Sequence, residues 1–340
     1  MNEAIRRTIE AIHARRAPNA RETEAAFAAI MRGEATPAQI GAILMGLAVL
    51  GETPEIVAGA ARAMREASVK IKPKARPLID TCGTGGDRAG TFNISTTVAF
   101  VAAACGAHVA KHGNRAVSSR AGSADVLEAL GCNLDLAPEK VEEAIDTIGV
   151  GFLFAPKHHP AMRHAAPVRR ELGVRTVFNL LGPLTNPAGA PRQVIGTFSR
   201  EAMRLVAEAL CALGCERALV VHGRDGLDEI TTTDVTDAIL IEGSKVAAEF
   251  EIDPEAFGIP RAAPEDLRGG TAEDNAAILR AVLDGEASPR RDIVLLNAGA
   301  ALWIAGIADG IAQGIARAAE AIDAGLARRK LEAYIRFTQG

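Results

Sequence analysis

The spacing of apolar residues changes near residue 70, and this change limits the folds open to the chain. Residues 1–70 follow a helical period and contain no candidate strand. Thr36-Pro-Ala-Gln39 has the form of a capping box with proline at the first helical position, and Thr53-Pro54 opens a helix in the same way. The sequence therefore predicts a small all-helical domain over residues 1–72.

Beyond residue 72, short apolar runs alternate with alanine-rich stretches of helical pattern. This alternation is typical of an α/β domain with a mostly parallel sheet flanked by helices, which we expect over residues 73–340. Segment 70–77 carries two prolines and four basic residues and has the composition of a linker. The runs that predict strands are Leu78-Ile79, Gly151–Phe154, Ala218–Val221, Ala238–Ile241 and Ile293–Leu296.

Composition excludes several classes of protein. With 340 residues, 48% of them hydrophobic, the chain can fill a sizeable core. A net charge of −4 without a basic tract argues against nucleic acid as a partner. Five cysteines without a Cys-x-x-Cys pair are typical of thiols in a reducing compartment. No signal peptide is evident and the apolar run Ile40–Leu50 is too short to span a bilayer, so we expect a cytoplasmic protein without a membrane partner.

A glycine-rich loop, Asp80-Thr-Cys-Gly-Thr-Gly-Gly-Asp87, follows the first expected strand. Glycine adopts left-handed backbone conformations, which let successive amides approach an anion. The hydroxyl-rich stretch Asn93–Thr97 would then open a helix whose N-terminus favours negative charge. A plain tight turn has a similar composition, so this loop alone leaves both interpretations open.

A second polar segment, Lys111–Ser119, combines two cations, a histidine, an asparagine and hydroxyls, and Gly122-Ser123 follows it. Ammonium and guanidinium groups form charge-assisted hydrogen bonds with phosphate oxygens. Expected loops after Ile79, Ala110 and Val221 would emerge at the carboxyl ends of strands, where ligands of such sheets bind.

The third segment contains two adjacent acids, Asp228 and Glu229, after the expected strand Ala218–Val221. Neighbouring carboxylates repel each other unless a cation lies between them, and oxygen ligands suit Mg²⁺ that also holds phosphates. A solvated loop would also carry such a pair. Neither the P-loop nor the dinucleotide fingerprint fits the glycine loop. Together the three segments suggest a phosphorylated sugar whose pyrophosphate is chelated by Mg²⁺, and hence glycosyl transfer at a ribose carbon.

The chain resembles the anthranilate phosphoribosyltransferases of tryptophan biosynthesis, with motifs in the family's order from about residue 80 to 233. The longest and most specific motif is Arg175-Thr-Val-Phe-Asn-Leu-Leu-Gly-Pro-Leu-Thr-Asn-Pro187, hereafter the 175–187 block. The other motifs are Gly83-Thr-Gly-Gly-Asp87, Asn93-Ile-Ser-Thr96, Lys111-His-Gly-Asn114 with Ser118-Ser119, Val168-Arg-Arg-Glu-Leu-Gly173 and Asp228-Glu229.

The resemblance implies a reaction and a fold. The anthranilate amine would attack the anomeric carbon of phosphoribosyl pyrophosphate, with inversion and loss of pyrophosphate. The segment from about 160 to 190 would return to complete the helical domain, and the protein would be a homodimer through that domain.

The resemblance also implies binding residues. Mg²⁺ would be held by Ser95, Asp228 and Glu229, and anthranilate by Gly83, Asn114 and Arg169. His159 and His112 are candidates for the same tunnel, and no catalytic residue is assigned beyond His112 as a candidate. Phosphoribosyl pyrophosphate would be bound by Gly83, Gly86, Asp87, Thr91, Asn93, Ile94, Ser95, Thr96, Lys111, His112, Gly113, Asn114, Arg115, Ala116, Val117, Ser118, Ser119 and Ser123.

The remaining histidines are expected to be supporting residues: His158 and His164 at the surface or behind the binding residues, and His222 as a positional residue ending a strand. Two positions depart from the family pattern. Ala116 replaces a usual serine, and Arg88 stands where glycine is common, so substrate affinity is expected to differ.

Two other functions stay open at this point. A pyrimidine-nucleoside phosphorylase shares the expected architecture but should lack the Asp228-Glu229 pair and the Arg169 contact with a carboxylate. A non-catalytic nucleic-acid-binding relative should show a basic face and eroded loops.

Overall fold

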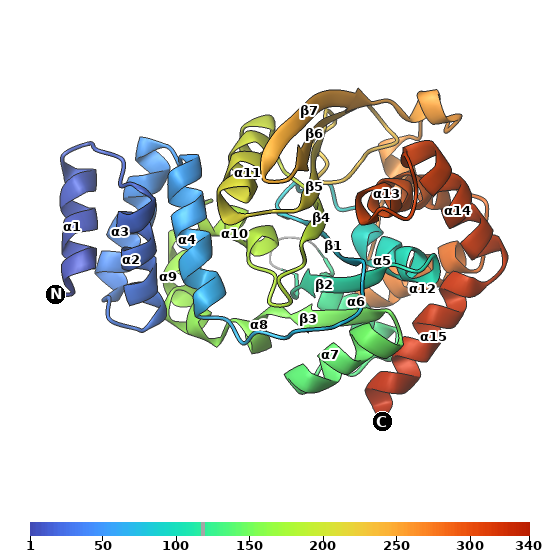
Figure 1. Ribbon diagram of the computed structural model, residues 1–340, viewed down its shortest axis with the longest axis horizontal. Coiled ribbons are helices and arrows are strands. Elements are labelled where there is room, and N and C mark those ends of the chain that lie inside the picture. The colour runs from blue at the N-terminus through green and yellow to red at the C-terminus, as the bar shows by residue number, and fades with distance from the viewer. Residues whose placement is uncertain (117–119) are drawn as a thin grey trace.

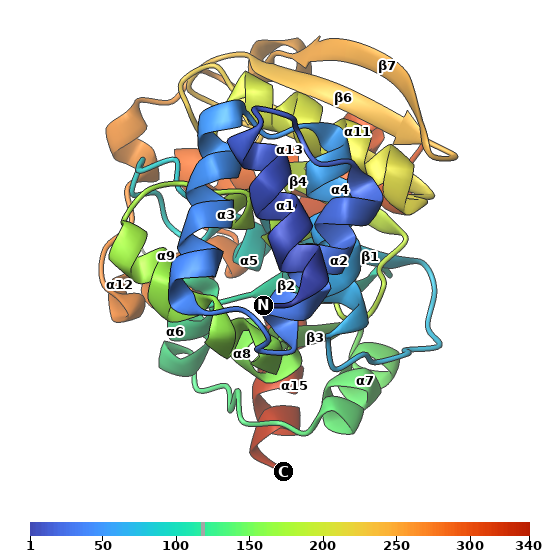
Figure 2. The same ribbon diagram turned by 90° about the vertical axis from the view of Figure 1, so that its left-hand side faces the viewer.

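The computed structural model describes residues 1–116 and 120–340. Four helices precede the first strand, in agreement with the all-helical pattern expected there, and Thr36 and Thr53 cap α3 and α4 with proline following each. These helices are α1 (Glu3–His13), α2 (Ala20–Met31), α3 (Pro37–Leu50) and α4 (Pro54–Glu66). Figure 1 shows them side by side at one end of the molecule, and Figure 2 shows α1 and α3 on the face turned away from the sheet.

Within the described residues, seven strands form one sheet in the order β3-β2-β1-β4-β5-β6-β7. Strands β1 to β5 are parallel and β6 pairs antiparallel with both β5 and β7, so the expected mostly parallel sheet is confirmed. The strands are β1 (Leu78–Gly83), β2 (His108–Gly113), β3 (Val150–Phe154), β4 (Arg192–Gly196), β5 (Arg217–Gly223), β6 (Thr236–Glu242) and β7 (Lys245–Ile252).

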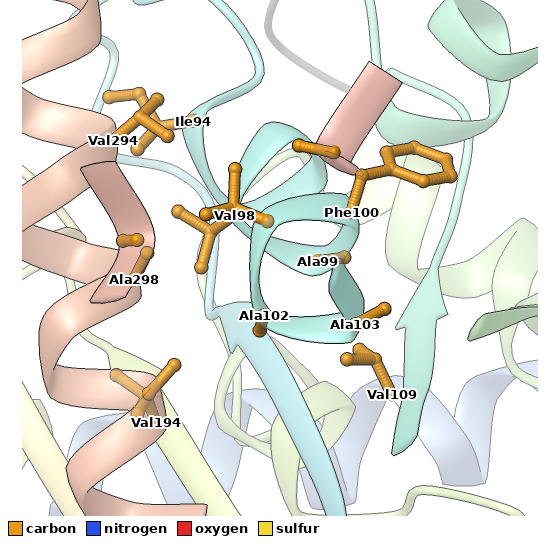
Figure 3. Close-up of a cluster of buried hydrophobic side chains, with 14 of the residues drawn as sticks. Ile94, Val98, Ala99, Phe100, Ala102, Ala103, Val109, Val194, Val294 and Ala298 are labelled. Atoms are coloured by element: carbon orange, nitrogen blue, oxygen red, sulfur yellow. The ribbon is translucent and has the colours of Figure 1, made fainter. Parts of the chain in front are cut away.

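Helices cover both faces of the sheet (Figure 1). On one face, α5 (Ile94–Ala104) and α13 (Pro289–Ala305) pack side by side on the sheet, and Figure 3 shows Val109 of β2 beneath α5 and Val194 of β4 beside α13. On the other face, α11 (Arg200–Leu213) packs on Val220 of β5 and its neighbours. The remaining helices are α6 (Ser123–Ala129), α7 (Pro138–Thr147), α8 (Ala155–His158), α9 (Ala166–Leu172), α10 (Phe178–Leu184), α12 (Ala272–Leu283), α14 (Ile311–Asp323) and α15 (Leu326–Gln339), with short 3-10 turns at Pro160–His164, Pro254–Phe257 and Pro264–Leu267.

The predicted strand at Ile293–Leu296 is wrong, because these residues lie inside α13. Helix α13 is buried on nearly every side, so its apolar residues run consecutively and lose the helical period that would have identified them. Strands β4 and β7 were missing from the prediction, and β2 was implied only by the loop expected after Ala110. The five cysteines are free, and Cys82, Cys132 and Cys215 are buried.

Segment 160–190 contacts the N-terminal helices, since α9 lies against α3 and α10 against α4. One hydrophobic cluster runs from α1–α4 through α9 and α10 to α11 and the sheet. Division into domains at residue 72 stays a prediction. No helix among the described residues is long and apolar enough to cross a membrane.

Candidate active site

The loops after β1, β2 and β5 meet at one edge of the sheet, because these strands are parallel and their carboxyl ends point the same way. Hydrogen bonds join the loops directly. Asp228, after β5, accepts a bond of 2.7 Å at Oδ2 from the amide of Gly85 in the β1 loop. Asn93, after β1, donates from Nδ2 to the carbonyl of Ala121, which follows β2, at 3.4 Å. The three predicted segments therefore form one site.

Glycines make room for Asp228. A Cβ at Gly83, the last residue of β1, would lie 2.1 Å from Asp228 Oδ2. A Cβ at Gly196, the last residue of β4, would lie 1.6 Å from the Asp228 carbonyl oxygen. No side chain fits at either position, so the acidic loop depends on both glycines. Sequence reasoning identified Gly83 and missed Gly196; the signal was present, because a glycine also ends β2 and β5.

The glycine loop has the backbone conformation that its composition predicts. Gly85, Gly86 and Gly90 have φ angles of 68°, 82° and 67°. Arg88 also has a positive φ, 62°, which explains physically why glycine suits this position. Thr91 forms an isolated bridge with Arg268, which anchors the end of the loop.

Helix α5 begins directly after this loop and presents its N-terminus to the acidic pair. The amide of Ser95 donates to Glu229 Oε1 at 3.2 Å. Ile94 is buried in the core beside Val294 (Figure 3), and the Thr96 side chain is 1% exposed, so at both positions mainly the backbone is available to a ligand.

Lys111 lies inside the protein, 4% exposed, rather than in the open loop. Its Nζ donates to the carbonyl of Thr81 at 2.6 Å and to Ser95 Oγ at 3.2 Å. The ammonium group is therefore held behind the N-terminus of α5, where its charge also acts on Glu229.

The acidic pair has raised pKa values. Burial raises the pKa of Glu229 to about 7, although the Lys111 ammonium opposes the shift. Burial raises the pKa of Asp228 well above its ordinary value, and the negative charges of Asp87 and Glu229 add to the effect. Both acids thus lack enough positive charge around them, which is the environment of a site that receives a cation.

The β2 loop is only partly arranged as predicted. Asn114 is exposed, and its carbonyl accepts from Ser123 Oγ at 3.3 Å. Arg115 is exposed but already paired with α6, through ion pairs to Asp125 at 3.0 Å and to Glu128 at 2.5 Å. The Ala116 amide donates to Asp125 at 3.0 Å. Three predicted residues, Val117, Ser118 and Ser119, lie outside the described residues.

Arg169 of α9 and the histidines His112 and His159 lie close to α10 or to each other. The Arg169 guanidinium carbon lies 4.9 Å from the centre of the Phe178 ring, and burial lowers its pKa. No ion pair or hydrogen bond of its guanidinium is found within residues 1–116 and 120–340. The rings of His112 and His159 are 5.0 Å apart, and the Nε2 atom of each is buried without a partner in the same part of the chain.

Both histidines of this pair are neutral near pH 7. Burial lowers the pKa of His112 to about 3 and that of His159 to about 4. His112 Nδ1 lies 3.0 Å from the carbonyl oxygen of Gly182, which fixes the ring orientation.

His158 is not at the surface, which corrects part of the expectation. It is 2% exposed, and its Nδ1 lies 2.8 Å from the carbonyl oxygen of Val69. His164 packs against Gly33, far along the chain from the loops. His222 Nδ1 lies 2.8 Å from the carbonyl oxygen of Thr197, in agreement with a positional role.

Comparison with known proteins gives two family matches. Residues 75–328 match the glycosyl transferase family, a/b domain, and residues 3–68 match the helical bundle domain of the glycosyl transferase family. A curated anthranilate phosphoribosyltransferase from Thioalkalivibrio sulfidiphilus is 52% identical over 338 residues, covering 99% of this chain and 98% of the relative. The one from Rhodospirillum rubrum is 56% identical over 310 residues, 91% of this chain and 89% of the relative.

Solved structures agree with these matches. The crystal structure of anthranilate phosphoribosyltransferase from Thermus thermophilus superposes with a TM-score of 0.93 at 47% identity, covering 98% of this chain and 99% of the other. The Saccharomyces cerevisiae enzyme in complex with PRPP and Mg has a TM-score of 0.92 at 26% identity, with 99% of both chains covered. By sequence along its whole length and by fold, the chain belongs to the anthranilate phosphoribosyltransferases.

Proposed function

We propose that the loops at the carboxyl ends of β1, β2 and β5 transfer the phosphoribosyl group of phosphoribosyl pyrophosphate (PRPP) to the amine of anthranilate. The products are N-(5-phosphoribosyl)anthranilate and pyrophosphate, in L-tryptophan biosynthesis. One observation carries the assignment of the site: Asp228 reaches across the sheet edge to the Gly85 amide, at 2.7 Å, so the acidic pair lies on the glycine loop.

PRPP would bind along the glycine loop, the N-terminus of α5 and the β2 loop. Backbone amides of the left-handed glycines and of the first turn of α5 supply donors to phosphate oxygens. The side chains of Lys111 and Arg115 already have partners in the protein. They would therefore attract the phosphates mainly by their positive charge, and less by direct hydrogen bonds. Arg88 adds a cation beside the same loop.

The residues around the acidic pair fit Mg²⁺. Asp228, Glu229 and the Ser95 hydroxyl offer oxygen ligands. The raised pKa values of both acids mean that their charged forms are unfavourable here unless a cation binds beside them. Within residues 1–116 and 120–340 no group of three or more His, Cys, Asp or Glu could hold a metal alone. The remaining ligands would thus be substrate oxygens and water, as is usual for this ion. When bound, Mg²⁺ would offset the charge that develops on the departing pyrophosphate.

Anthranilate would bind on the side of Arg169. A guanidinium fixed on an aromatic ring and free of acidic partners in the described part of the chain suits a carboxylate, which it can meet bidentately. His112 and His159 offer neutral ring nitrogens, and His112 lies against Gly182 of α10, the helix that also carries Phe178. With pKa values of about 3 and 4 they are weak bases, so we assign them hydrogen bonding and orientation of the aryl amine.

The reaction then depends on position and electrostatics. An aryl amine is already neutral at pH 7, so no base is needed before it attacks the anomeric carbon. The site holds amine and carbon in line while the loops receive the leaving pyrophosphate. Water or a nearby carboxylate takes the proton afterwards.

We also propose a cytoplasmic homodimer that uses the helical end of the molecule. Val49 of α3 is 79% exposed, and α1 and α3 form the outer face there (Figure 2). Sedimentation of wild-type protein and of Val49→Asp tests this; a dimer in wild type that dissociates in the variant is expected, and a monomeric wild type contradicts the proposal.

The enzyme assay tests the function directly. Purified protein with PRPP and Mg²⁺ should consume anthranilate, seen as a fall in its fluorescence, and release pyrophosphate. A chelator should stop both. Nicotinate, uracil and thymine in place of anthranilate serve as controls. Release of the base from a pyrimidine nucleoside by free phosphate, with formation of the sugar 1-phosphate and no turnover of anthranilate, would favour the phosphorylase instead.

A further inference from the structure

The 175–187 block is the most specific motif of the chain, yet it contributes none of the residues assigned above to PRPP, anthranilate or Mg²⁺. In the structure it forms α10 and the turn that leads toward β4. This segment lies between the N-terminal helices and the strands that carry the loops of the site.

On its outer side the block contacts α9, which bears Arg169, and α4. The Arg169 guanidinium stacks on Phe178, the first residue of α10. Arg65 of α4 donates from Nε to the carbonyl of Leu184 at 2.6 Å, at the end of α10. A cation is favoured there by the partial negative charge of the helix C-terminus.

On its inner side the block is tied to β1 and β2 through one side chain. Asn186 donates from Nδ2 to Asp80 Oδ2 at 2.7 Å and to the carbonyl of Ala110 at 2.8 Å. Its Oδ1 accepts from the amide of Ala188 at 2.9 Å, so the side chain has a partner at each polar atom. Asn186 therefore joins the block to both strands.

A ring of contacts closes through His112. Asp80 Oδ1 accepts from the His112 amide at 3.2 Å, and His112 Nδ1 lies 3.0 Å from the carbonyl oxygen of Gly182. Gly182 lies in α10 and Asn186 two residues beyond its end, so the block contacts His112 directly through Gly182 and indirectly through Asn186 and Asp80.

This ring is buried. Asp80 is 0% exposed and Asn186 is 7% exposed. A buried carboxylate needs its hydrogen-bond donors, because an unpaired one is unfavourable. The position of the ring is therefore strongly determined, which is what a fixed spacing between two binding regions requires.

We propose that Asp80 and Asn186 are positioning residues that hold the anthranilate region, Arg169 with the block, at a fixed distance from the PRPP loops after β1 and β2. The inference rests on the proposed reaction. Neither side chain is assigned a substrate contact; they set the relative place of amine and anomeric carbon, on which the rate of an in-line displacement depends steeply.

Asn186→Ala tests the inference, with Gln193→Ala as the matched control. Gln193 is also a buried amide that holds the block, since Nε2 donates to the carbonyl of Pro183 at 2.8 Å, but it has no bond to Asp80 or His112. Affinities for PRPP with Mg²⁺ and for anthranilate are measured separately by calorimetry, and turnover is measured at saturation on folded enzyme.

We expect Asn186→Ala to keep both affinities within about threefold while turnover falls about ten- to a hundredfold. Gln193→Ala should lower the melting temperature and leave turnover within about twofold. Equal turnover in Asn186→Ala and wild type, or equal losses in the two variants, would overturn the inference.

Asp80→Asn is a second variant that keeps the volume of the site and places a donor opposite the Asn186 donor. It should reproduce the loss of turnover with retained affinities, and unchanged turnover would again refute the positioning role. A wild-type enzyme that releases no pyrophosphate would instead refute the proposed reaction, so the two failures are distinguishable.

Discussion

Arg169 illustrates how one side chain can be prepared for a ligand before the ligand arrives. Its guanidinium is held on the Phe178 ring, and burial disfavours its charge. A carboxylate that binds there gains a charge-assisted contact without ordering a flexible arm.

Replacing Arg169 by alanine should raise the KM for anthranilate about ten- to a hundredfold, because one charge-assisted contact contributes roughly 1.5–3 kcal/mol. The KM for PRPP should stay nearly unchanged. Steady-state kinetics with each substrate varied in turn measures both. Arg170→Ala is the control, since Arg170 is the exposed neighbour on the same helix. Equal damage to both KM values would mean that Arg169 does not bind anthranilate.

Arg88 adopts a left-handed backbone at φ 62°, and Arg15 does so at φ 54°. This conformation disfavours a residue with a Cβ by about 1–2 kcal/mol, whereas glycine loses about 0.5–1 kcal/mol in backbone entropy. Arg88→Gly and Arg15→Gly should therefore each raise the free energy of unfolding by about 0.5–1 kcal/mol. Only Arg88→Gly should also change the KM for PRPP. Denaturant melts and kinetics of both variants decide the matter; a destabilised Arg88→Gly would contradict this explanation.

At the scale of single residues, the sequence predicted which kinds of side chain the site contains better than it predicted which residues those side chains contact. It placed the acidic pair beside the glycine loop, because loops after parallel strands meet at one end of the sheet. Arg169 was assigned to the site only through the family resemblance, and that assignment stays a prediction. It could not show that Lys111 turns inward to Thr81 and Ser95, because a lysine on a strand has either face available. Asp80 and Asn186 were invisible for a similar reason: their partner lies 106 positions away.

At the scale of the elements, several strands that lead to the site end in glycine, and two of these glycines leave room for the acidic loop. Gly83 of β1 and Gly196 of β4 both face Asp228, and each excludes any side chain. The loop after β5 is thereby placed by two strands that precede it in the chain.

Gly196→Ala should destabilise the protein by about 1–3 kcal/mol, because the new Cβ would lie 1.6 Å from the Asp228 carbonyl oxygen and the loop must move. The Mg²⁺ concentration needed for half-maximal activity should rise at the same time. Thermal melts and a Mg²⁺ titration measure the two effects. Gly310→Ala, where nothing lies within 4 Å, should change neither. A Gly196→Ala enzyme with normal Mg²⁺ dependence would show that this loop does not hold the metal.

Each helix or strand that the sequence did not predict correctly was missed for a physical reason. Strand β7 is exposed and carries Lys245 and Glu249, so it lacks the apolar run by which the other strands were found. Strand β4 begins at an arginine and contains Gln193, whose burial depends on the block across from it. Helix α13 was mistaken for a strand because packing on all sides removes its polar face.

For the whole molecule, the acidic pair makes stability depend on pH. A carboxyl group whose pKa is higher in the folded state takes up protons on folding, so its contribution becomes less favourable as pH rises through the folded pKa. For Glu229 that window runs from its ordinary value of 4.5 to about 7. His112 and His159, with lowered pKa values, act in the opposite sense at acidic pH, where folding is opposed as they charge.

The double variant Asp228→Asn, Glu229→Gln separates these effects. Without metal at pH 8 it should be more stable than wild type by about 1 kcal/mol, since the repulsion and burial of two charges are removed. The difference should vanish toward pH 4.5, and turnover should be abolished. Denaturant melts of both proteins between pH 4.5 and 8 measure the difference in the free energy of unfolding. His112 and His159 are present in both proteins, so their contribution cancels.

Mg²⁺ with PRPP provides the complementary measurement, because a ligand stabilises the state that binds it. The melting temperature of wild type should rise and that of the double variant should not. Equal stabilisation of both proteins would exclude the acidic pair as the metal site.

The place of β1 inside the sheet, between β2 and β4, has a consequence for biosynthesis. Its neighbour β2 follows soon after it in the chain, but β4 follows only after α6 to α10. Gly85 and Asp228, which complete the site, are 143 positions apart. Such distant pairings form slowly, and a chain emerging from the ribosome exposes one edge of β1 until β4 has been made. A strand that joins the loops of the finished site thus spends part of synthesis with an unpaired edge, the feature that exposes a nascent chain to aggregation.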